Sequence, residues 1–142
     1  MYKSILAIAI VALFIGTVTY AEPNSEWDRG SQYNQLFNTK SMETVKGVVA
    51  EITDFQLPDS EKGVLLKLES DNGTHLVHLG PAWFLENQGI QLETGDKITV
   101  KGSQVEYQNG SALIAQAVVK KNHMLVLRSA SGAPAWSAWT TL

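Results

Sequence analysis

The sequence contains no cysteine among its 142 residues. This absence excludes disulfide bonds, thiolate catalysis, cysteine-ligated iron–sulfur clusters and covalent haem attachment. A lipid anchor attached at a cysteine is excluded as well. Without covalent cross-links, the folded chain must depend on a hydrophobic core, and its length is sufficient for one domain.

Positive charge is also scarce, with 11 Lys and Arg against 14 Asp and Glu and a formal net charge of −3. Nucleic-acid-binding domains normally carry a basic face, so the composition argues against that class. No GxSxG motif accompanies a serine, and the acidic residues are scattered over turns and polar strand positions. We therefore expect no enzymatic activity and no cofactor.

Long apolar runs are missing except at the N-terminus, where residues 5–16 follow the positively charged Lys3. This run is shorter than the roughly 20 residues that span a bilayer. A small-residue cleavage site follows at Thr19-Tyr20-Ala21. We expect a signal peptide at residues 1–21, cleaved after Ala21, and a periplasmic location. An uncleaved membrane anchor is the alternative.

Residues 22–43 are polar and carry four large apolar side chains, Trp27, Tyr33, Leu36 and Phe37. So many large apolar residues are unusual in a disordered leader, which is the competing interpretation. We expect an irregular N-terminal arm that docks on the domain through these side chains.

From residue 44 the pattern favours β-strands. TVKGVVAEITDF is rich in β-branched residues and predicts a long curved strand with a bend or bulge at Gly47. GVLLKLES and THLVHL flank Asp71-Asn72-Gly73, which predicts a hairpin. Further strands are expected at ITVKGS, after the turn signal Asn109-Gly110, and at MLVLRS.

The segment HLGPAWFLENQG, residues 78–89, interrupts the strands. Gly80 can serve as an N-cap, Pro81 suits the first helical position, and Gly89 can end a helix in the left-handed conformation. We expect a short helix whose Trp83 and Phe84 seal the core. The alternative is a cleft at this end of the domain, with His78 and Trp83 in its wall.

This order of elements resembles the OB-fold, a five-stranded Greek-key barrel with one helix between its third and fourth strands. Residues 92–102, LETGDKITVKG, resemble the fourth strand of many small OB-fold domains. The expected fold class is therefore all-β with one short helix. The expected units are a signal peptide at 1–21, an arm at 22–43, the OB-fold domain at 44–128 and a C-terminal tail at 129–142.

Four motifs also resemble a group of short exported bacterial OB-fold proteins of uncharacterised function. The shared patterns are ETVxGxV, HLGPAWFL, GDxIxVxG and LR…GxPxW, which begin here at Glu43, His78, Gly95 and Leu127. The resemblance covers roughly residues 33–139. Some members of that group are labelled DNA-binding, which follows from the fold alone, and one fold hosts many functions.

The histidines do not predict a metal site. His75 and His78 lie three apart on one strand, so their side chains point to opposite faces, and His123 sits in an expected turn. Nucleic-acid binding would need aromatic side chains and basic residues on the second and third strands. Their expected exposed positions offer Lys67, Glu69 and Thr74, with no aromatic ring.

Candidate binding residues are His78, Trp83, Arg128, Trp136 and Trp139. The two tail tryptophans either fold back on the barrel as a clasp, which we favour, or form an apolar patch for a partner. Arg128 could stack on one of them or pair with an acid. We expect a non-enzymatic periplasmic binding or accessory module, docking to another exported protein or a membrane complex. A small-ligand or metal-ion carrier and a nucleic-acid-binding OB protein are the alternatives.

Overall fold

The computed structural model describes residues 24–140, with the side chains of residues 139 and 140 left out of the description. The expected signal peptide at 1–21 and its cleavage site lie outside this range. Within the described range, no helix is both long and apolar enough to cross a membrane.

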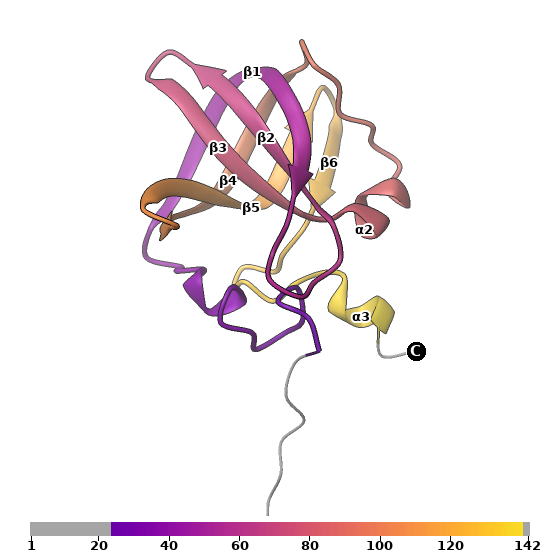
Figure 1. Cartoon of the computed structure of the whole chain (residues 1–142). Coiled ribbons are helices and arrows are strands. Elements are labelled where there is room, and N and C mark those ends of the chain that lie inside the picture. Colours follow the sequence, from indigo (N-terminus) through magenta and orange to yellow (C-terminus); the bar gives the residue numbers. More distant parts are fainter. Residues whose placement is uncertain (1–23, 141–142) are drawn as a thin grey trace, which may run out of the picture.

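Six strands and one short helix form the body of the protein (Figure 1). In chain order these are β1 (Met42–Phe55), β2 (Gly63–Ser70), β3 (Gly73–Pro81), α2 (Ala82–Glu86), β4 (Lys97–Tyr107), β5 (Gly110–Lys120) and β6 (His123–Val126). A 3-10 turn, η1 (Asn34–Leu36), precedes them, and α3 (Ser137–Thr140) ends the described chain.

The first five strands close into a barrel. β1 pairs with β2 and with β4, β2 pairs with β3, and β4 pairs with β5, all antiparallel. A short parallel pairing of β3 with β5, at Val77 with Leu113 and His78 with Ile114, completes the ring. This is the OB-fold topology with its helix between the third and fourth strands, as predicted from the sequence. β6 adds an antiparallel strand outside the ring, on the edge of β5.

The long strand β1 pairs with strands in both halves of the barrel because it bends. Its first half pairs with β4 and its second half with β2, and the register with β2 shifts between Val49 and Glu51. The bulge therefore lies at Ala50, and the expectation of a bulge at Gly47 is wrong. Gly47 has a different role, since a Cβ at this position would collide with the backbone carbonyl of Glu69 on β2.

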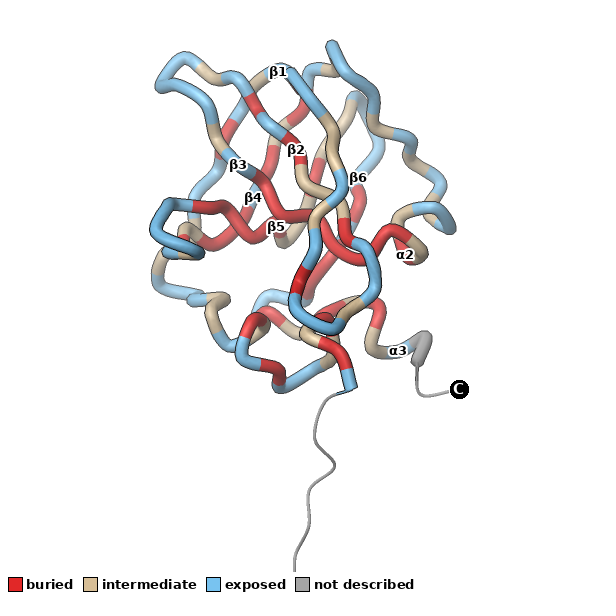
Figure 2. Tube along the Cα trace, viewed as in Figure 1, coloured by how far each residue is buried: buried red, intermediate tan, exposed pale blue. Residues whose placement is uncertain are grey.

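The core follows the alternation of side chains along the strands (Figure 2). Most strands contribute apolar side chains mainly from one face, whereas β5 is buried on both faces at Leu113 and Ile114. Those with the least exposure include Val49, Leu66, Leu68, Val77, Val100, Ile114 and Val118. Burial of such side chains stabilises the fold by about 1.5–3 kcal/mol each.

The short helix lies where the sequence predicts it, although its ends differ. Pro81 still belongs to β3 and is the N-cap, with an extended backbone, so the helix begins at Ala82. It ends at Glu86, with Asn87 as the C-cap at φ −97°. Gly89 is not among the glycines with positive φ, so the expected left-handed stop at Gly89 is wrong. The helix ends in 3-10-type bonds instead, in which the backbone N–H groups of Asn87 and Gln88 donate to the carbonyls of Phe84 and Leu85 at 3.1 Å each.

The arm and the tail lie together beneath the barrel in Figure 1. The four apolar side chains of the arm pack as predicted, with Trp27 and Tyr33 buried and Leu36 and Phe37 half-buried against the core. The tail turns back in a tight loop, in which Ala135 N–H donates to the carbonyl of Leu127 at 2.9 Å.

Candidate functional site

A cluster of rings joins the arm, the barrel and the tail, and we call it the aromatic clasp. Its members come from six segments that are distant in sequence. They are Trp27 and Tyr33 of the arm, Phe55 of β1, His78 of β3, Phe84 of α2, Tyr107 of β4 and Trp136 of the tail. Most of these pairs meet edge to face, the geometry that aromatic quadrupoles favour.

His78 is buried inside the clasp, with 3% of its surface exposed. Its Nδ1 lies 2.9 Å from the hydroxyl oxygen of Tyr33, and the two rings stack with centroids 5.9 Å apart. Phe55 covers it at a centroid distance of 4.2 Å. Burial, aided by the nearby charge of Arg128, lowers the pKa of His78 to about 4. The ring is therefore neutral near pH 7.

Tyr33 is suited to hold that neutral ring. Burial raises the pKa of its phenol, so the O–H stays protonated and can donate to His78 Nδ1. Tyr33 also contacts Trp27 and Tyr107, at centroid distances of 5.3 Å and 5.9 Å. His78 and Tyr33 thus form a structural pair in which each buried polar group has a partner.

The two buried tryptophans are tied to backbone carbonyls. Trp136 Nε1 donates to the carbonyl of Trp27 at 2.7 Å, and Trp27 Nε1 donates to the carbonyl of Glu61 at 2.8 Å. Their rings meet edge to face with centroids 5.8 Å apart. Gly80 makes room for this contact, because a Cβ there would lie 2.9 Å from the ring of Trp136. The tail therefore closes on the barrel as a clasp at Trp136, whereas the side chain of Trp139 lies outside the description.

Arg128 is a buried cation, with 1% of its surface exposed. Its guanidinium lies over the rings of Trp136 and Phe37, at 5.0 Å and 5.6 Å from their centroids. Nη1 donates to the carbonyl of Gly132 at 3.1 Å, while Nε and Nη2 have no partner among the described residues. Burial lowers the pKa of Arg128 to about 10. Of its two predicted roles, stacking on a tail tryptophan is observed, and no carboxylate of the described chain pairs with it.

The clasp occupies the face on which OB-folds bind their ligands, which lies on strands two and three between the β1–β2 and β4–β5 loops. Here Phe55 and Tyr107 stand at the roots of those loops, and His78 lies on β3 between them. The ring of Tyr33 contacts all three. The arm of the chain thus fills the face that other OB-folds use for ligands.

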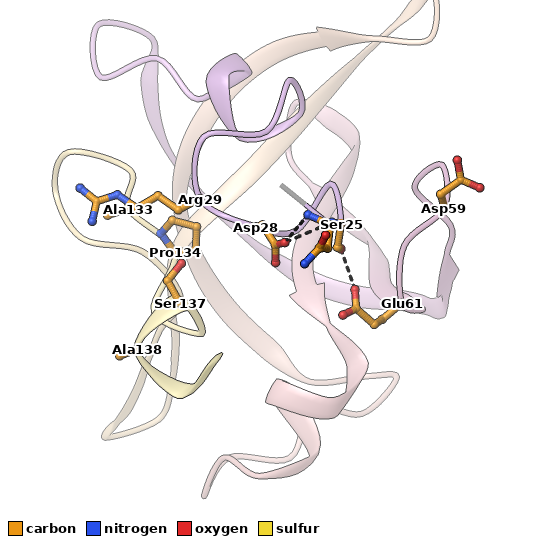
Figure 3. A pocket seen from close by; sticks show the side chains of 10 residues that line it. Ser25, Asp28, Arg29, Asp59, Glu61, Ala133, Pro134, Ser137 and Ala138 are labelled. Atoms are coloured by element: carbon orange, nitrogen blue, oxygen red, sulfur yellow. Dashed lines mark hydrogen bonds between the residues drawn. The ribbon is translucent and has the colours of Figure 1, made fainter. Parts of the chain in front are cut away.

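An open polar pocket of about 810 Å³ lies between the arm, the β1–β2 loop and the tail (Figure 3). Two of its carboxylates already accept hydrogen bonds from the arm. Asp28 Oδ2 accepts from the backbone N–H groups of Asn24 and Ser25 at 2.9 and 3.1 Å, and Glu61 accepts from the Ser25 hydroxyl at 2.7 Å. The carboxylates of Asp28 and Glu61 therefore hold the start of the arm in place. Asp59 points away from them in Figure 3.

A second hollow, of about 130 Å³, is apolar and lies beside α2. We call it the α2 groove; its wall is formed by Ile52, Val64, Leu79, Ala82, Leu85, Glu86, Ile90, Gln91, Leu92 and Leu125. Trp83 neighbours this groove in sequence and is half-buried against the core. Phe84, by contrast, is buried, and its ring centroid lies 5.6 Å from that of Trp136. Of the two residues expected to seal the core, only Phe84 is fully buried.

Of the five predicted site residues, the structure brings three into one place. His78, Arg128 and Trp136 all belong to the clasp or stack on it, whereas Trp83 lies at its border. A role of these residues in binding a ligand or partner stays a prediction. Phe55 and Tyr107 were not singled out, although aromatic residues at strand ends next to the two ligand loops are a usable signal.

No group of three or more His, Asp or Glu side chains in the described chain is placed to hold a metal ion. His75 Nε2 lies 3.1 Å from the Ser70 hydroxyl, and His78 faces Tyr33. The expected separation of these two histidines on β3 is thus observed.

One of three comparisons with known proteins identifies a family. Among curated proteins, none matches the chain significantly. The second OB-fold domain of replication protein A from Methanococcus maripaludis, a solved structure, covers 58% of this chain and 85% of its own length, with 21% identity and a TM-score of 0.40. Residues 41–125, more than half of the chain, match the MamS/MamX magnetosome protein family. The chain therefore belongs to the MamS/MamX magnetosome protein family.

Proposed function

We propose that this chain is a non-enzymatic OB-fold accessory module in the periplasm, docking to another exported protein or a membrane complex of the magnetosome. Family membership supports the magnetosome context. The observation that carries the docking role is the open apolar α2 groove, since Tyr33 of the arm already fills the face that OB-folds use for ligands.

Closure of this face disfavours the nucleic-acid alternative. Single-stranded nucleic acid binds OB-folds by stacking bases on exposed aromatic rings. Here Tyr33 and Trp27 are 4% and 2% exposed; Tyr33 already stacks on His78, and Trp27 meets Tyr33 and Trp136 edge to face. Displacing each of them into water would cost about 1.5–3 kcal/mol.

The buried polar groups of the clasp support a structural role better than a catalytic one. His78 uses Nδ1 for Tyr33, and its lowered pKa of about 4 makes it a weak base. A general base works best with a pKa near the working pH. Arg128 is enclosed by Phe37 and Trp136 and lies out of reach of a ligand in solution.

The α2 groove is the surface we assign to the partner. Its walls are mainly aliphatic, with half-exposed Leu85, Ile90 and Leu92 around a hollow of about 130 Å³. An apolar anchor set in such a pocket and surrounded by polar positions is the usual centre of a protein interface. The exposed Glu86 marks its rim.

Site-specific photo-cross-linking in the native cells tests this proposal. A photo-reactive residue at Glu86, on the rim of the α2 groove, should give an adduct with one exported or membrane protein. The same residue at Asn72, an exposed position in the β2–β3 hairpin, is the matched control and should give none.

A specific pair of results would replace the docking proposal by the carrier alternative. If neither position gives an adduct, and native mass spectrometry of the purified protein shows a retained small molecule, the carrier alternative replaces docking. Its site would be the polar pocket of about 810 Å³ between arm and tail.

A further inference from the structure

One face of the sheet formed by β1, β4, β5 and β6 remains open to solvent. Residues opposite each other in antiparallel strands point to the same side of the sheet. Lys46 lies opposite Thr99, Thr99 opposite Val119, and Val119 opposite Met124. We call this surface the lysine face; its residues are Thr44, Lys46, Val48, Lys97, Thr99, Lys101, Val119, Lys121, Met124 and Val126.

The charge of this face differs in sign from that of the whole chain. The chain has a formal net charge of −3, yet the ten residues of the face include four lysines and no acidic residue, and Glu69 of β2, opposite Val48, lies at its border. Lys46, Lys97, Lys101 and Lys121 are all exposed. The ion pairs of the described chain use other lysines, namely Lys62, Lys67 and Lys120. The four lysines of the face form no ion pair in the described chain, although Glu43 and Asp71 line a neighbouring hollow with Lys46 and the charge of Lys121 acts on Asp96.

Three of these lysines surround a shallow hollow of about 400 Å³. Lys46, Lys97 and Lys121 line it, with Val48 and Val119 beside them and no carboxylate among the lining residues. These lysines come from β1, from β4 and from the β5–β6 turn and line one open depression. This arrangement suits an anionic headgroup, because each lysine supplies a point charge with several donors.

Exposed apolar side chains accompany the lysines. Met124 is 63% exposed, Val126 50% and Val48 39%. No aromatic ring lies on this face to stack with bases, which disfavours nucleic acid. Surfaces that bind membranes combine apolar side chains, which enter the interface, with lysines that meet anionic lipids.

We propose that the lysine face binds the surface of an anionic phospholipid membrane, with a lipid phosphate held between Lys46, Lys97 and Lys121. This contact uses the sheet face of β1, β4, β5 and β6 and is separate from the α2 groove. Lys121 lies in the turn between β5 and β6, so the hollow includes the end of that hairpin.

Vesicle binding by the full chain tests the proposal. The triple variant K46Q/K97Q/K121Q is compared with K40Q/K62Q/K67Q, which loses the same formal charge from exposed lysines elsewhere. Each lysine near an anionic surface contributes about a fivefold gain in affinity. The first variant should therefore bind vesicles containing about one third phosphatidylglycerol about 100-fold more weakly than the second.

Binding to neutral phosphatidylcholine vesicles is the control for membrane binding by the N-terminal apolar segment. That segment is the same in all variants, so its contribution to the affinity is the same as well. The gain from phosphatidylglycerol should fall at high salt in the wild type and in K40Q/K62Q/K67Q. Thermal unfolding should be alike in both triple variants, since all six lysines are exposed. Equal affinity of the two variants for anionic vesicles would overturn the proposal. A second result would also overturn the proposal: an oligonucleotide or an acidic peptide binds tightly in a way that requires Lys46, and anionic vesicles bind no better than neutral ones.

Discussion

Acidification should destabilise the fold through His78. Its pKa is about 4 in the folded protein against 6.5 for an ordinary histidine, because burial and the charge of Arg128 disfavour the imidazolium. As pH falls through 6.5, the unfolded chain takes up a proton at His78 and the folded chain does not. The free energy of unfolding therefore falls between pH 6.5 and about 4, and the loss is complete below about 4.

The size of this loss follows from the difference between the two pKa values. At about 1.4 kcal/mol per pH unit, it corresponds to about 3 kcal/mol. Protonation would also place a second positive charge in the apolar site of Arg128. The arm should separate first, because Tyr33 is the hydrogen-bond partner of His78.

Urea unfolding at about pH 7 and about pH 4 measures this quantity. Other groups titrate in the same range, so the informative number is the difference between variants. His78→Gln should reduce the acid-induced loss by about 3 kcal/mol relative to wild type. His123→Gln, at an exposed position, should retain the full loss. If His78→Gln loses as much stability on acidification as wild type, the burial argument for His78 is wrong.

Three further substitutions test the clasp by urea unfolding at neutral pH. Trp136→Ala should cost about 3–5 kcal/mol, because it removes a buried ring and the hydrogen bond to the Trp27 carbonyl; a cost below about 1 kcal/mol would mean that the tail is not closed. Gly80→Ala should cost about 1–3 kcal/mol, since its Cβ would press on Trp136, whereas Gly89→Ala, with nothing within 4 Å, should stay within about 0.5 kcal/mol. Arg128→Met should cost no more than about 1 kcal/mol, because two nitrogens of the buried cation have no partner in the described chain; a loss above about 3 kcal/mol would contradict this.

The barrel could be predicted because its signals are local. Alternation in GVLLKLES and ITVKGS and the Asn and Gly residues of the hairpins depend on neighbours within a few positions. The helix boundaries could not be predicted to the residue. Pro81 suits both the last position of a strand and the first of a helix, and the backbone pairing of Gly63 with Pro81 decides for the strand.

The clasp could be predicted only in part, because its contacts join distant segments. The Trp136 bond to Trp27 spans 109 residues, and no local pattern identifies that partner. The aromatic residues of the arm were recognisable as docking side chains, since water disfavours them on a polar leader. Charged side chains are usually exposed or paired with an opposite charge, whereas Arg128 is buried without a carboxylate partner. Its burial depends on stacking against Trp136, which the closed tail supplies.

The lysine face could be predicted from the sequence only within one strand. The alternation of Lys97, Thr99 and Lys101 along one strand can be read directly. That Lys46 stands beside them depends on the register of β1 with β4, where Lys46 is opposite Thr99. A shift of one residue would move Lys46 to the other side of the sheet.

The central claim is that the arm of the chain closes the face that other OB-folds use for ligands, and nuclear Overhauser contacts test it most directly. The claim predicts contacts from the ring protons of Tyr33 to those of His78 and Tyr107, whose centroids lie 5.9 Å away in each case. It also predicts contacts between the indoles of Trp27 and Trp136. Random-coil shifts for Tyr33 and Trp27 with no contact to the barrel would contradict the claim, because the ligand face would then be open in solution.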